Sequence, residues 1–146
     1  MIQIELFGKP TPWAASRTNG KHHYNPKNKE KEHAKWQIKA QYRDAPLTGA
    51  MSLDFTFFMP IPKSTSLVKR KQMLSHLILP TIKVDATNLQ KFYEDCLKGI
   101  VIEDDQFVTD VASRKRYSEK PGVLIRIISL ITHMPNFRQE GKDASN

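Results

Sequence analysis

The 146-residue sequence contains a single cysteine, Cys96, and no long apolar run. One cysteine cannot form an intrachain disulfide, and it cannot build a zinc site from thiolates. No stretch is apolar enough to cross a bilayer, and the N-terminus lacks the basic region and apolar run of a signal peptide. Internal repeats and long low-complexity segments are also missing. These absences predict a cytoplasmic protein with no membrane partner.

Acidic residues are in the minority, with 15 Asp and Glu against 23 Lys and Arg, which gives a formal net charge of +8. Such a surplus is typical of proteins that bind polyphosphates, although basic charge alone does not identify a nucleic-acid-binding protein. The length suits one domain with one modest core. We therefore expect a single domain over residues 1–132, followed by a polar tail over 133–146 that is expected to be disordered.

Alternation of apolar and polar residues predicts strands, and apolar residues three and four positions apart predict helices. Strands are expected at residues 2–7, 51–59, 100–102, 107–117 and 123–131. Helices are expected at residues 26–43, 66–75 and 88–98. This pattern predicts an α+β domain with a mixed or antiparallel sheet and two to three helices.

The third helix has the clearest signal, because its apolar residues fall on one face. These residues are Leu89, Phe92, Tyr93, Cys96 and Leu97. Thr87 or Asn88 is expected to cap its start, and Gly99 is expected to end it in the left-handed conformation. Because Cys96 lies on the apolar face, a catalytic thiol is not expected.

Polar residues of this helix and of its flanking loops have the side chains that phosphodiester hydrolysis needs. The opposite face of the helix carries Asn88, Lys91, Asp95 and Lys98, with Asp85 before it and Asp104 and Asp105 after it. Chain connectivity permits the two acidic loops to meet, so Asp85, Asp104 and Asp105 are candidate Mg²⁺ ligands. Lys91 is a candidate to stabilise negative charge on the phosphoryl group.

Ordinary structural roles explain each of these residues equally well. Asp85 fits a solvated loop, Asn88 a helix cap, and Lys91 with Asp95 an i,i+4 surface pair of small energetic value. The Asp104–Asp105 pair fits a plain turn. Composition and spacing alone favour these ordinary roles.

Clusters of basic residues flank both acidic loops and are candidate DNA contacts. They are Lys63, Lys69, Arg70, Lys71, Lys83, Arg114, Lys115 and Arg116, with Lys9, Arg17 and Lys21 nearer the start. On an alternating strand Lys115 lies on the opposite face from Arg114 and Arg116. The segment around His22–Tyr24 is expected to be a mobile polar loop. Packing in or near the core is expected for Trp13 and Trp36.

The run Lys83–Lys91, with sequence KVDATNLQK, resembles the signature of RusA-type Holliday-junction resolvases. Asp95, Gly99 and the pair Asp104–Asp105 extend the resemblance. Flanking features agree, and they are Gly8-Lys9-Pro10, Pro12, Tyr24, Pro26, Pro60-x-Pro62-Lys63, Lys115, Tyr117 and Pro121-Gly122-Val123. The similarity spans about residues 2–131.

This resemblance implies a magnesium-dependent endodeoxyribonuclease, with Mn²⁺ as a substitute ion, that resolves four-way DNA junctions by paired nicks in recombination and repair. It implies a homodimer, encoded by a bacterium, a phage or a prophage. The implied catalytic residues are Asp85, Lys91 and Asp105. The implied metal ligands are Asp85, Asp104 and Asp105, with Thr87, Asn88 and Asp95 in supporting positions.

Thr87 departs from the family pattern, because an aspartate usually stands at this position. A neutral hydroxyl is a weaker metal ligand than a carboxylate, so one anionic ligand is missing. The alternative hypothesis is therefore a catalytically weakened or inactive protein that binds branched DNA. Compensation by Glu103, Asp104 or Asp95 is left open.

Overall fold

The computed structural model describes residues 1–130, so the tail expected at 133–146 lies outside the described residues. The centre of the fold is a four-stranded sheet with the strand order β1-β6-β4-β5. The strands are β1 (Ile2–Phe7), β4 (Met51–Pro60), β5 (Val108–Ser118) and β6 (Gly122–Ser129). Strand β6 pairs antiparallel with β1 and β4, whereas β4 and β5 run parallel. The expected α+β domain with a mixed sheet is confirmed.

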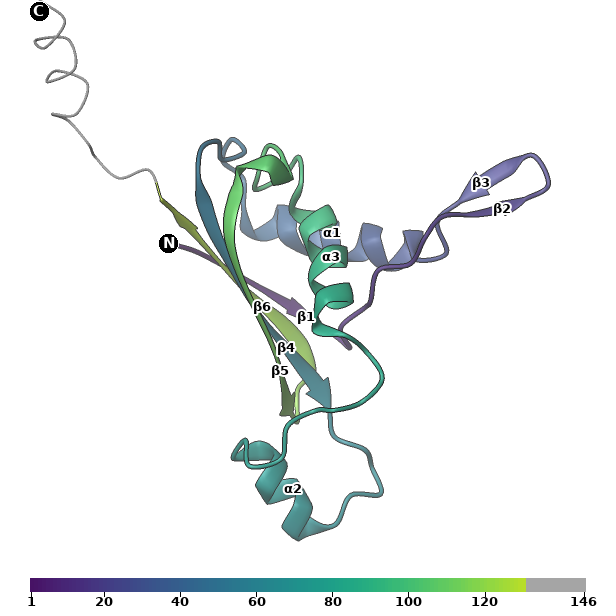
Figure 1. Cartoon of the computed structure of the whole chain (residues 1–146), viewed down its shortest axis with the longest axis vertical. Helices are drawn as coiled ribbons and strands as arrows, with labels where there is room; N and C mark the ends of the chain where they lie inside the picture. Colours follow the sequence, from purple (N-terminus) through teal and green to yellow (C-terminus); the bar gives the residue numbers. More distant parts are fainter. Residues whose placement is uncertain (131–146) are drawn as a thin grey trace, which may run out of the picture.

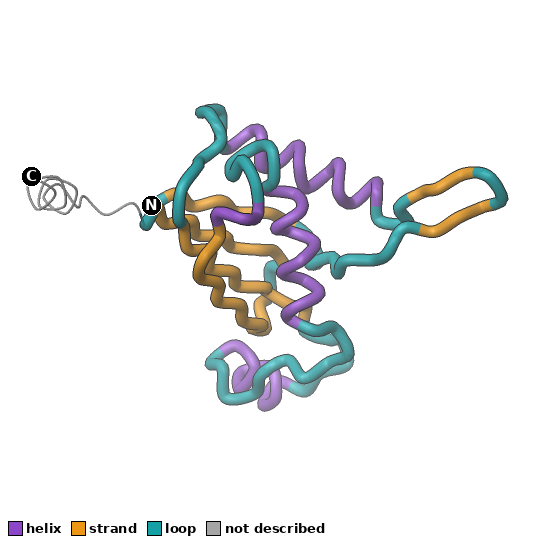
Figure 2. The backbone as a smooth tube through the Cα atoms, turned by 45° about the horizontal axis from the view of Figure 1, so that its top comes forward, coloured by secondary structure: helices purple, strands orange, loops and turns teal. Residues whose placement is uncertain are grey.

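Two helices, α1 (Asn28–Gln41) and α3 (Ala86–Leu97), pack on one face of this sheet (Figure 1, Figure 2). A third helix, α2 (Leu67–Leu74), lies in a separate lobe, which the chain forms after β4 and before α3. The 3₁₀ helix η1 (Asp105–Phe107) leads into β5. Strands β2 (Arg17–Asn19) and β3 (His22–Tyr24) form a second, two-stranded sheet that protrudes from the body (Figure 1).

The core lies between the sheet and the two helices. Strand β4 is the central contributor, since every second residue is at most 1% exposed, namely Met51, Leu53, Phe55, Phe57 and Met59. The apolar face predicted for α3 is buried against them, with Leu89, Cys96 and Leu97 fully inaccessible. The period-two strand pattern and the helical spacing in the sequence therefore identified the two faces that meet.

The predicted end of α3 is confirmed, but its predicted start is wrong. Gly99 has a φ of 84°, and its N–H donates to the Ile102 carbonyl oxygen at 2.7 Å. The N-cap residue is Asp85 rather than Thr87 or Asn88, so the first turn begins at Ala86. Residues 85, 87 and 88 are all residue types that favour this position, and the sequence alone does not rank them.

The strand expected at residues 100–102 is absent, and the chain turns there instead. Ile102 makes isolated bridges to Leu47 and Lys98, while Val101 is fully buried. A short apolar run satisfies a buried turn as well as a strand. The mobile loop expected around His22–Tyr24 is also wrong, because these residues form β3.

Candidate functional site

Asp85 occupies the N-terminal end of α3 in an unusual way for a capping residue. Its side chain is exposed and makes no hydrogen bond to the backbone N–H groups of the first turn. Both carboxylate oxygens are therefore open to an external ligand. The positive end of the helix dipole lies beside this carboxylate.

Asp104 and Asp105 lie at the opposite end of the same helix. The Asp104 carboxylate accepts the backbone N–H of Asp105 at 2.8 Å, and one of its oxygens lies 3.2 Å from Nζ of Lys98. Hydrogen bonding from Asp105 and Lys98 lowers the pKa of Asp104, and the same ion pair raises the pKa of Lys98. Asp105 lies 3.9 Å from the same ammonium. Lys98 thus contacts both carboxylates of this acidic pair.

The two acidic loops do not meet within one chain. Helix α3 has 12 residues, so its axis is about 18 Å long. Within residues 1–130, no group of three or more His, Cys, Asp or Glu side chains lies close enough to hold a metal ion. Among the described residues, Asp85 and the Asp104–Asp105 pair therefore do not belong to one cluster, and the individual ligand roles stay predictions.

Lys91 lies in the N-terminal half of α3 and stacks on Trp13. Its Nζ atom is 3.6 Å from the centre of the indole ring, within the range of a cation–π interaction. The backbone N–H of Trp13 donates to the Asn88 carbonyl oxygen at 3.0 Å. Trp13 packs against the core as expected, whereas Trp36 is 69% exposed, so the packing expected for Trp36 is wrong.

Lys115 of β5 binds the loop that carries Asp85. Its ammonium donates to the carbonyl oxygens of Val84 at 2.8 Å and of Ile82 at 3.2 Å. Hydrogen bonds from a charged donor are stronger than those between neutral groups, so they fix the residue immediately before Asp85. A DNA contact by Lys115 stays a prediction, while this bonding gives the side chain a positioning role.

The neighbouring arginines also have partners within the chain. Arg114 makes a two-pronged ion pair with Asp54, at 2.7 and 3.0 Å, and it further contacts Thr56. Hydrogen bonding to the guanidinium lowers the pKa of Asp54 and raises the pKa of Arg114. Arg116 donates to the Lys115 carbonyl oxygen at 2.8 Å. Whether these arginines also contact DNA stays a prediction.

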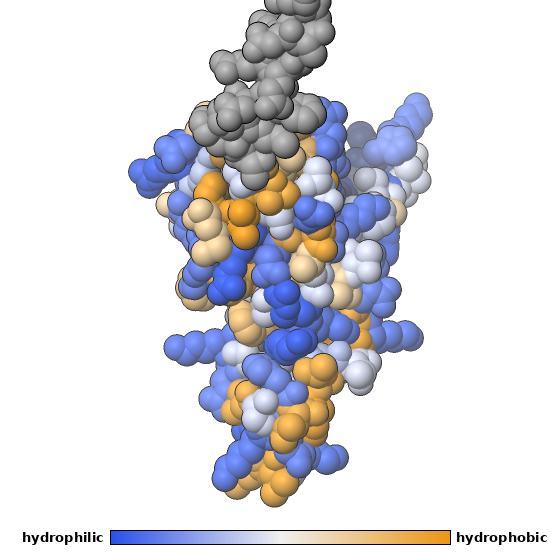
Figure 3. All heavy atoms as spheres, turned by 60° about the vertical axis from the view of Figure 1, so that its left-hand side comes forward, coloured by the Kyte–Doolittle hydropathy of each residue, from blue (hydrophilic) through white to orange (hydrophobic). Residues whose placement is uncertain are grey.

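The remaining predicted residues are distributed over two regions. Lys69, Lys71 and Lys83 are exposed on the α2 lobe, which we define as residues 61–84. In the same lobe Arg70 pairs with Glu119 at 3.6 Å. Apolar side chains also gather on the exposed surface of this lobe (Figure 3), and they are Leu67, Val68, Leu74, Leu77, Leu79 and Ile82. On α3, Asp95 lies 4.0 Å from Lys31 of α1.

Glu94 is a titratable residue at this helix that the sequence reasoning missed. Gln90 donates to its carboxylate at 3.1 Å, and Ser113 of β5 donates to Gln90 at 2.7 Å. Burial raises the pKa of Glu94, and the nearby Asp105 carboxylate adds to the rise. The i,i+4 spacing of Gln90 and Glu94 was the available signal. This chain of hydrogen bonds ties α3 to the strand that also carries Lys115.

A comparison with known protein families identifies the family of this chain. The family described as "Endodeoxyribonuclease RusA" matches residues 7–128, which include α3, both acidic loops and β5. The chain belongs to the RusA endodeoxyribonuclease family. A RusA-family nuclease acts on branched DNA and depends on a metal ion.

A curated protein extends the comparison. This chain is 32% identical over 134 residues to "Uncharacterized protein YqaN" of Bacillus subtilis (strain 168), an alignment that covers 86% of this chain and 94% of the relative. The name of the relative assigns it no activity. Within residues 1–130 of this RusA-family chain, no helix is long and apolar enough to cross a membrane.

Proposed function

We propose that this protein resolves four-way DNA junctions by paired, magnesium-dependent nicks, with Mn²⁺ as a substitute ion. The observation that carries the proposal is the RusA-family match across almost all of the described fold. It is supported by the exposed, uncapped carboxylate of Asp85 and by the ammonium of Lys91 on the same half of α3.

In this proposal Asp85 holds the ion and Lys91 interacts with the phosphate. When bound, magnesium supplies a Lewis acid for the phosphoryl oxygens and a means of activating water. The cation–π contact with Trp13 favours one position of the Lys91 side chain, which helps to place its charge before the phosphate arrives. Exposed lysines of the α2 lobe bind the flanking phosphates, and Lys83 is the nearest of them to Asp85 in the sequence.

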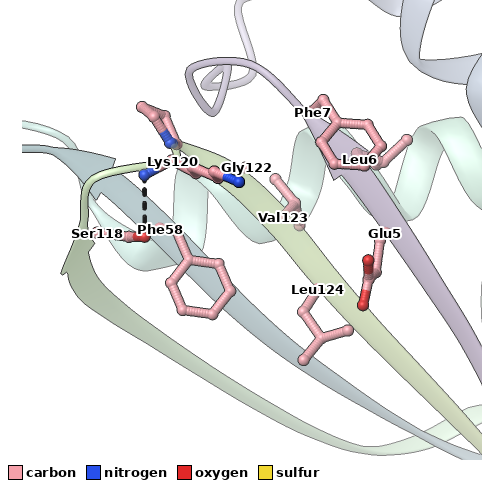
Figure 4. Close-up of a pocket in the computed structure, with 10 residues that line it drawn as sticks. Glu5, Leu6, Phe7, Phe58, Ser118, Lys120, Gly122, Val123 and Leu124 are labelled. Atoms are coloured by element: carbon pink, nitrogen blue, oxygen red, sulfur yellow. Dashed lines mark hydrogen bonds between the residues drawn. The ribbon is translucent and has the colours of Figure 1, made fainter.

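A second copy of the chain is part of the proposal, because Asp85 and the Asp104–Asp105 pair lie at opposite ends of α3 in one chain. A twofold dimer provides two equivalent sites, as two symmetric nicks require. It also permits Asp85 of one protomer to be completed by the Asp104–Asp105 pair of the other. The sheet face opposite the helices lies away from both acidic loops and is also partly apolar. There Phe7, Phe58 and Leu124 line a hollow of about 260 Å³ (Figure 4).

The test of this function is Asp85→Asn in the full chain. We expect nicking of a synthetic four-way junction in Mg²⁺ to be lost by at least about a hundredfold, because removing a group that acts mainly in the transition state lowers the rate far more than binding. Junction binding measured in Ca²⁺ should stay within about twofold of the unmodified protein, since in this proposal the lysines, and not Asp85, provide most of the contacts to the flanking phosphates. The matched control is Asp44→Asn, which neutralises an exposed acid after α1. Nicking at the unmodified rate by Asp85→Asn would contradict the proposal.

Thr87 supports a second candidate, a branched-DNA-binding protein whose catalysis is weakened or lost. Under this hypothesis the unmodified protein binds junctions but does not nick them at any Mg²⁺ or Mn²⁺ concentration. Thr87→Asp should then create activity, because a carboxylate binds these ions more strongly than a hydroxyl. Efficient nicking by the unmodified protein would exclude this candidate.

A further inference from the structure

The hairpin formed by β2 and β3, here called the arm (Arg17–Tyr24), projects away from the sheet and its helices (Figure 1, Figure 2). Every residue of the arm is exposed. Its two strands pair with each other, in the register Arg17 with Tyr24 and Asn19 with His22. The arm therefore contributes little to the core, and the fold does not explain its presence.

The segment that contains the arm, between Glu5 and Glu30, carries only positive charge. No acidic residue occurs between Glu5 and Glu30, whereas five basic residues do, namely Lys9, Arg17, Lys21, Lys27 and Lys29. A hairpin that served only as a connection would have no need of charge of a single sign. An uninterrupted basic segment on a projecting element is suited to a polyanionic partner.

The two faces of the arm also differ. Residues directly opposite each other on paired strands share a face, as do residues two apart on one strand. Arg17, Asn19, His22 and Tyr24 therefore lie on one face, and Thr18 and His23 lie on the other. The first face combines a cation with two rings, so it can bind a phosphate and stack on an unpaired base.

The base of the arm is attached to α3 beside the candidate catalytic residues. The Thr11 N–H donates to the Tyr93 hydroxyl at 3.0 Å, and Trp13 contacts both the Asn88 carbonyl and the Lys91 ammonium. The chain leaves this attachment and enters the arm four residues later. Any DNA that reaches Asp85 and Lys91 thus passes close to where the arm begins.

We propose that the arm binds the DNA next to the nicked phosphate through the face that carries Arg17 and Tyr24. This inference rests on the proposed function, which places the DNA at Asp85 and Lys91. It adds a specific contact between that DNA and the arm. Arg17 and Lys21 bind the sugar-phosphate backbone, while Tyr24 and His22 stack on bases at the branch point.

The first test removes charge from the arm and compares it with the same loss elsewhere. Arg17→Gln with Lys21→Gln in the full chain should lower junction affinity about tenfold and should reduce the slope of log K against log salt by about two. The control is Lys39→Gln with Arg43→Gln, which removes one lysine and one arginine from exposed positions at the far end of α1. Equal losses in the two variants would overturn the inference, because charge alone would then explain them.

The second test separates the two faces of the arm. His22→Ala with Tyr24→Ala should weaken junction binding severalfold, while Thr18→Ala with His23→Ala should leave it within about twofold. All four side chains are exposed, so both variants should keep the unmodified melting temperature. Equal binding by the two variants would overturn the assignment of the binding face.

A third test places the arm on the DNA. Cys96 is buried, and burial raises its thiol pKa to about 12, so His22→Cys introduces the one reactive thiol among the described residues. An iron chelate attached there should cut junction DNA within about one helical turn of the nicked phosphate. The inference would be overturned if cuts occurred only in DNA duplex far from the branch point. It would also be overturned if no cuts exceeded the background of the unmodified protein.

These outcomes distinguish failure of the arm inference from failure of the proposed function on which it rests. If the unmodified protein nicks junctions and the arm variants bind them with full affinity, only the arm inference fails. If the unmodified protein binds without nicking and the arm variants lose affinity, the arm inference stands and the nuclease proposal fails. If the unmodified protein does not bind branched DNA, both fail.

Discussion

At the scale of single residues, Lys115 shows how a basic side chain predicted to contact DNA can instead stabilise the protein itself. Its position on β5 predicted a phosphate contact, yet its ammonium donates to two backbone carbonyls just before Asp85. A loop at the start of a helix has carbonyl groups that no ladder satisfies, and a charged donor satisfies two of them at once. The geometry of Asp85 thus depends on a residue about 30 positions later in the sequence.

We expect Lys115→Gln to lower nicking about tenfold while junction affinity stays within about twofold, because a misplaced catalytic group reduces the rate more than binding. Rates at saturating DNA and binding titrations across a salt series would measure the two effects. The control is Arg116→Gln, which removes the same charge from the next residue. A loss of affinity with a smaller salt slope, and no loss of rate at saturation, would return Lys115 to the phosphate contacts.

At the scale of elements, the parallel pairing of β4 and β5 places opposite charges side by side. The register sets Thr56 against Arg114, and the guanidinium reaches Asp54 two residues earlier on the same face of β4. This ion pair is partly exposed, so solvent reduces its value, but its two-pronged geometry favours a measurable contribution. It joins the edge strand to the centre of the sheet.

Asp54→Asn should therefore lower the free energy of unfolding by about 1 kcal/mol at neutral pH. Folding lowers the pKa of Asp54 below its ordinary value of 3.8, so the contribution is complete above that value and is lost as the pH falls through the folded pKa. Urea unfolding of both proteins between pH 7 and about pH 2.5 would measure the difference. Asp110→Asn, an exposed acid on β5, is the control. A difference that grows in acid would contradict this account.

At the scale of the whole molecule, the length of α3 sets the main constraint on the candidate site. Asp85 lies at one end and the Asp104–Asp105 pair at the other, about 18 Å apart along the axis. A dimer that joins these ends between protomers would make the activity depend on association. The molar mass in solution should then be twice 16.8 kDa, as measured by light scattering.

Mixing two inactive variants tests where the centre is built. Asp85→Asn and Asp105→Asn are each expected to be inactive, because each protein lacks one acid at both centres. In mixed dimers one centre collects both substitutions and the other collects none, so an equimolar exchange should restore about a quarter of the activity. The control is the Asp85→Asn protein alone, at the same total concentration and taken through the same exchange. A mixture as inactive as its parents would place each centre within a single chain.

Much of the fold was predictable because its signals are local. The period-two pattern of residues 51–59 and the helical spacing from Leu89 to Leu97 predicted β4 and α3, and Gly99 predicted where α3 ends. The arm was missed because its strands of three residues are short and polar, and no apolar alternation distinguishes them from a loop. The turn at 100–102 was missed because burial alone does not distinguish a strand from a turn.

The sequence by itself determined the α+β class, the core faces of β4 and α3, and the residues that carry the RusA-family match, because periodicity and motif spacing are properties of neighbouring positions. Only the tertiary structure decided which side chains meet. It paired Lys115 with the Val84 carbonyl, Arg114 with Asp54 and Lys91 with Trp13, and it held the acidic loops apart at the two ends of one helix. These contacts join residues distant in sequence, and their distances follow from the packing of rigid helices on a twisted sheet.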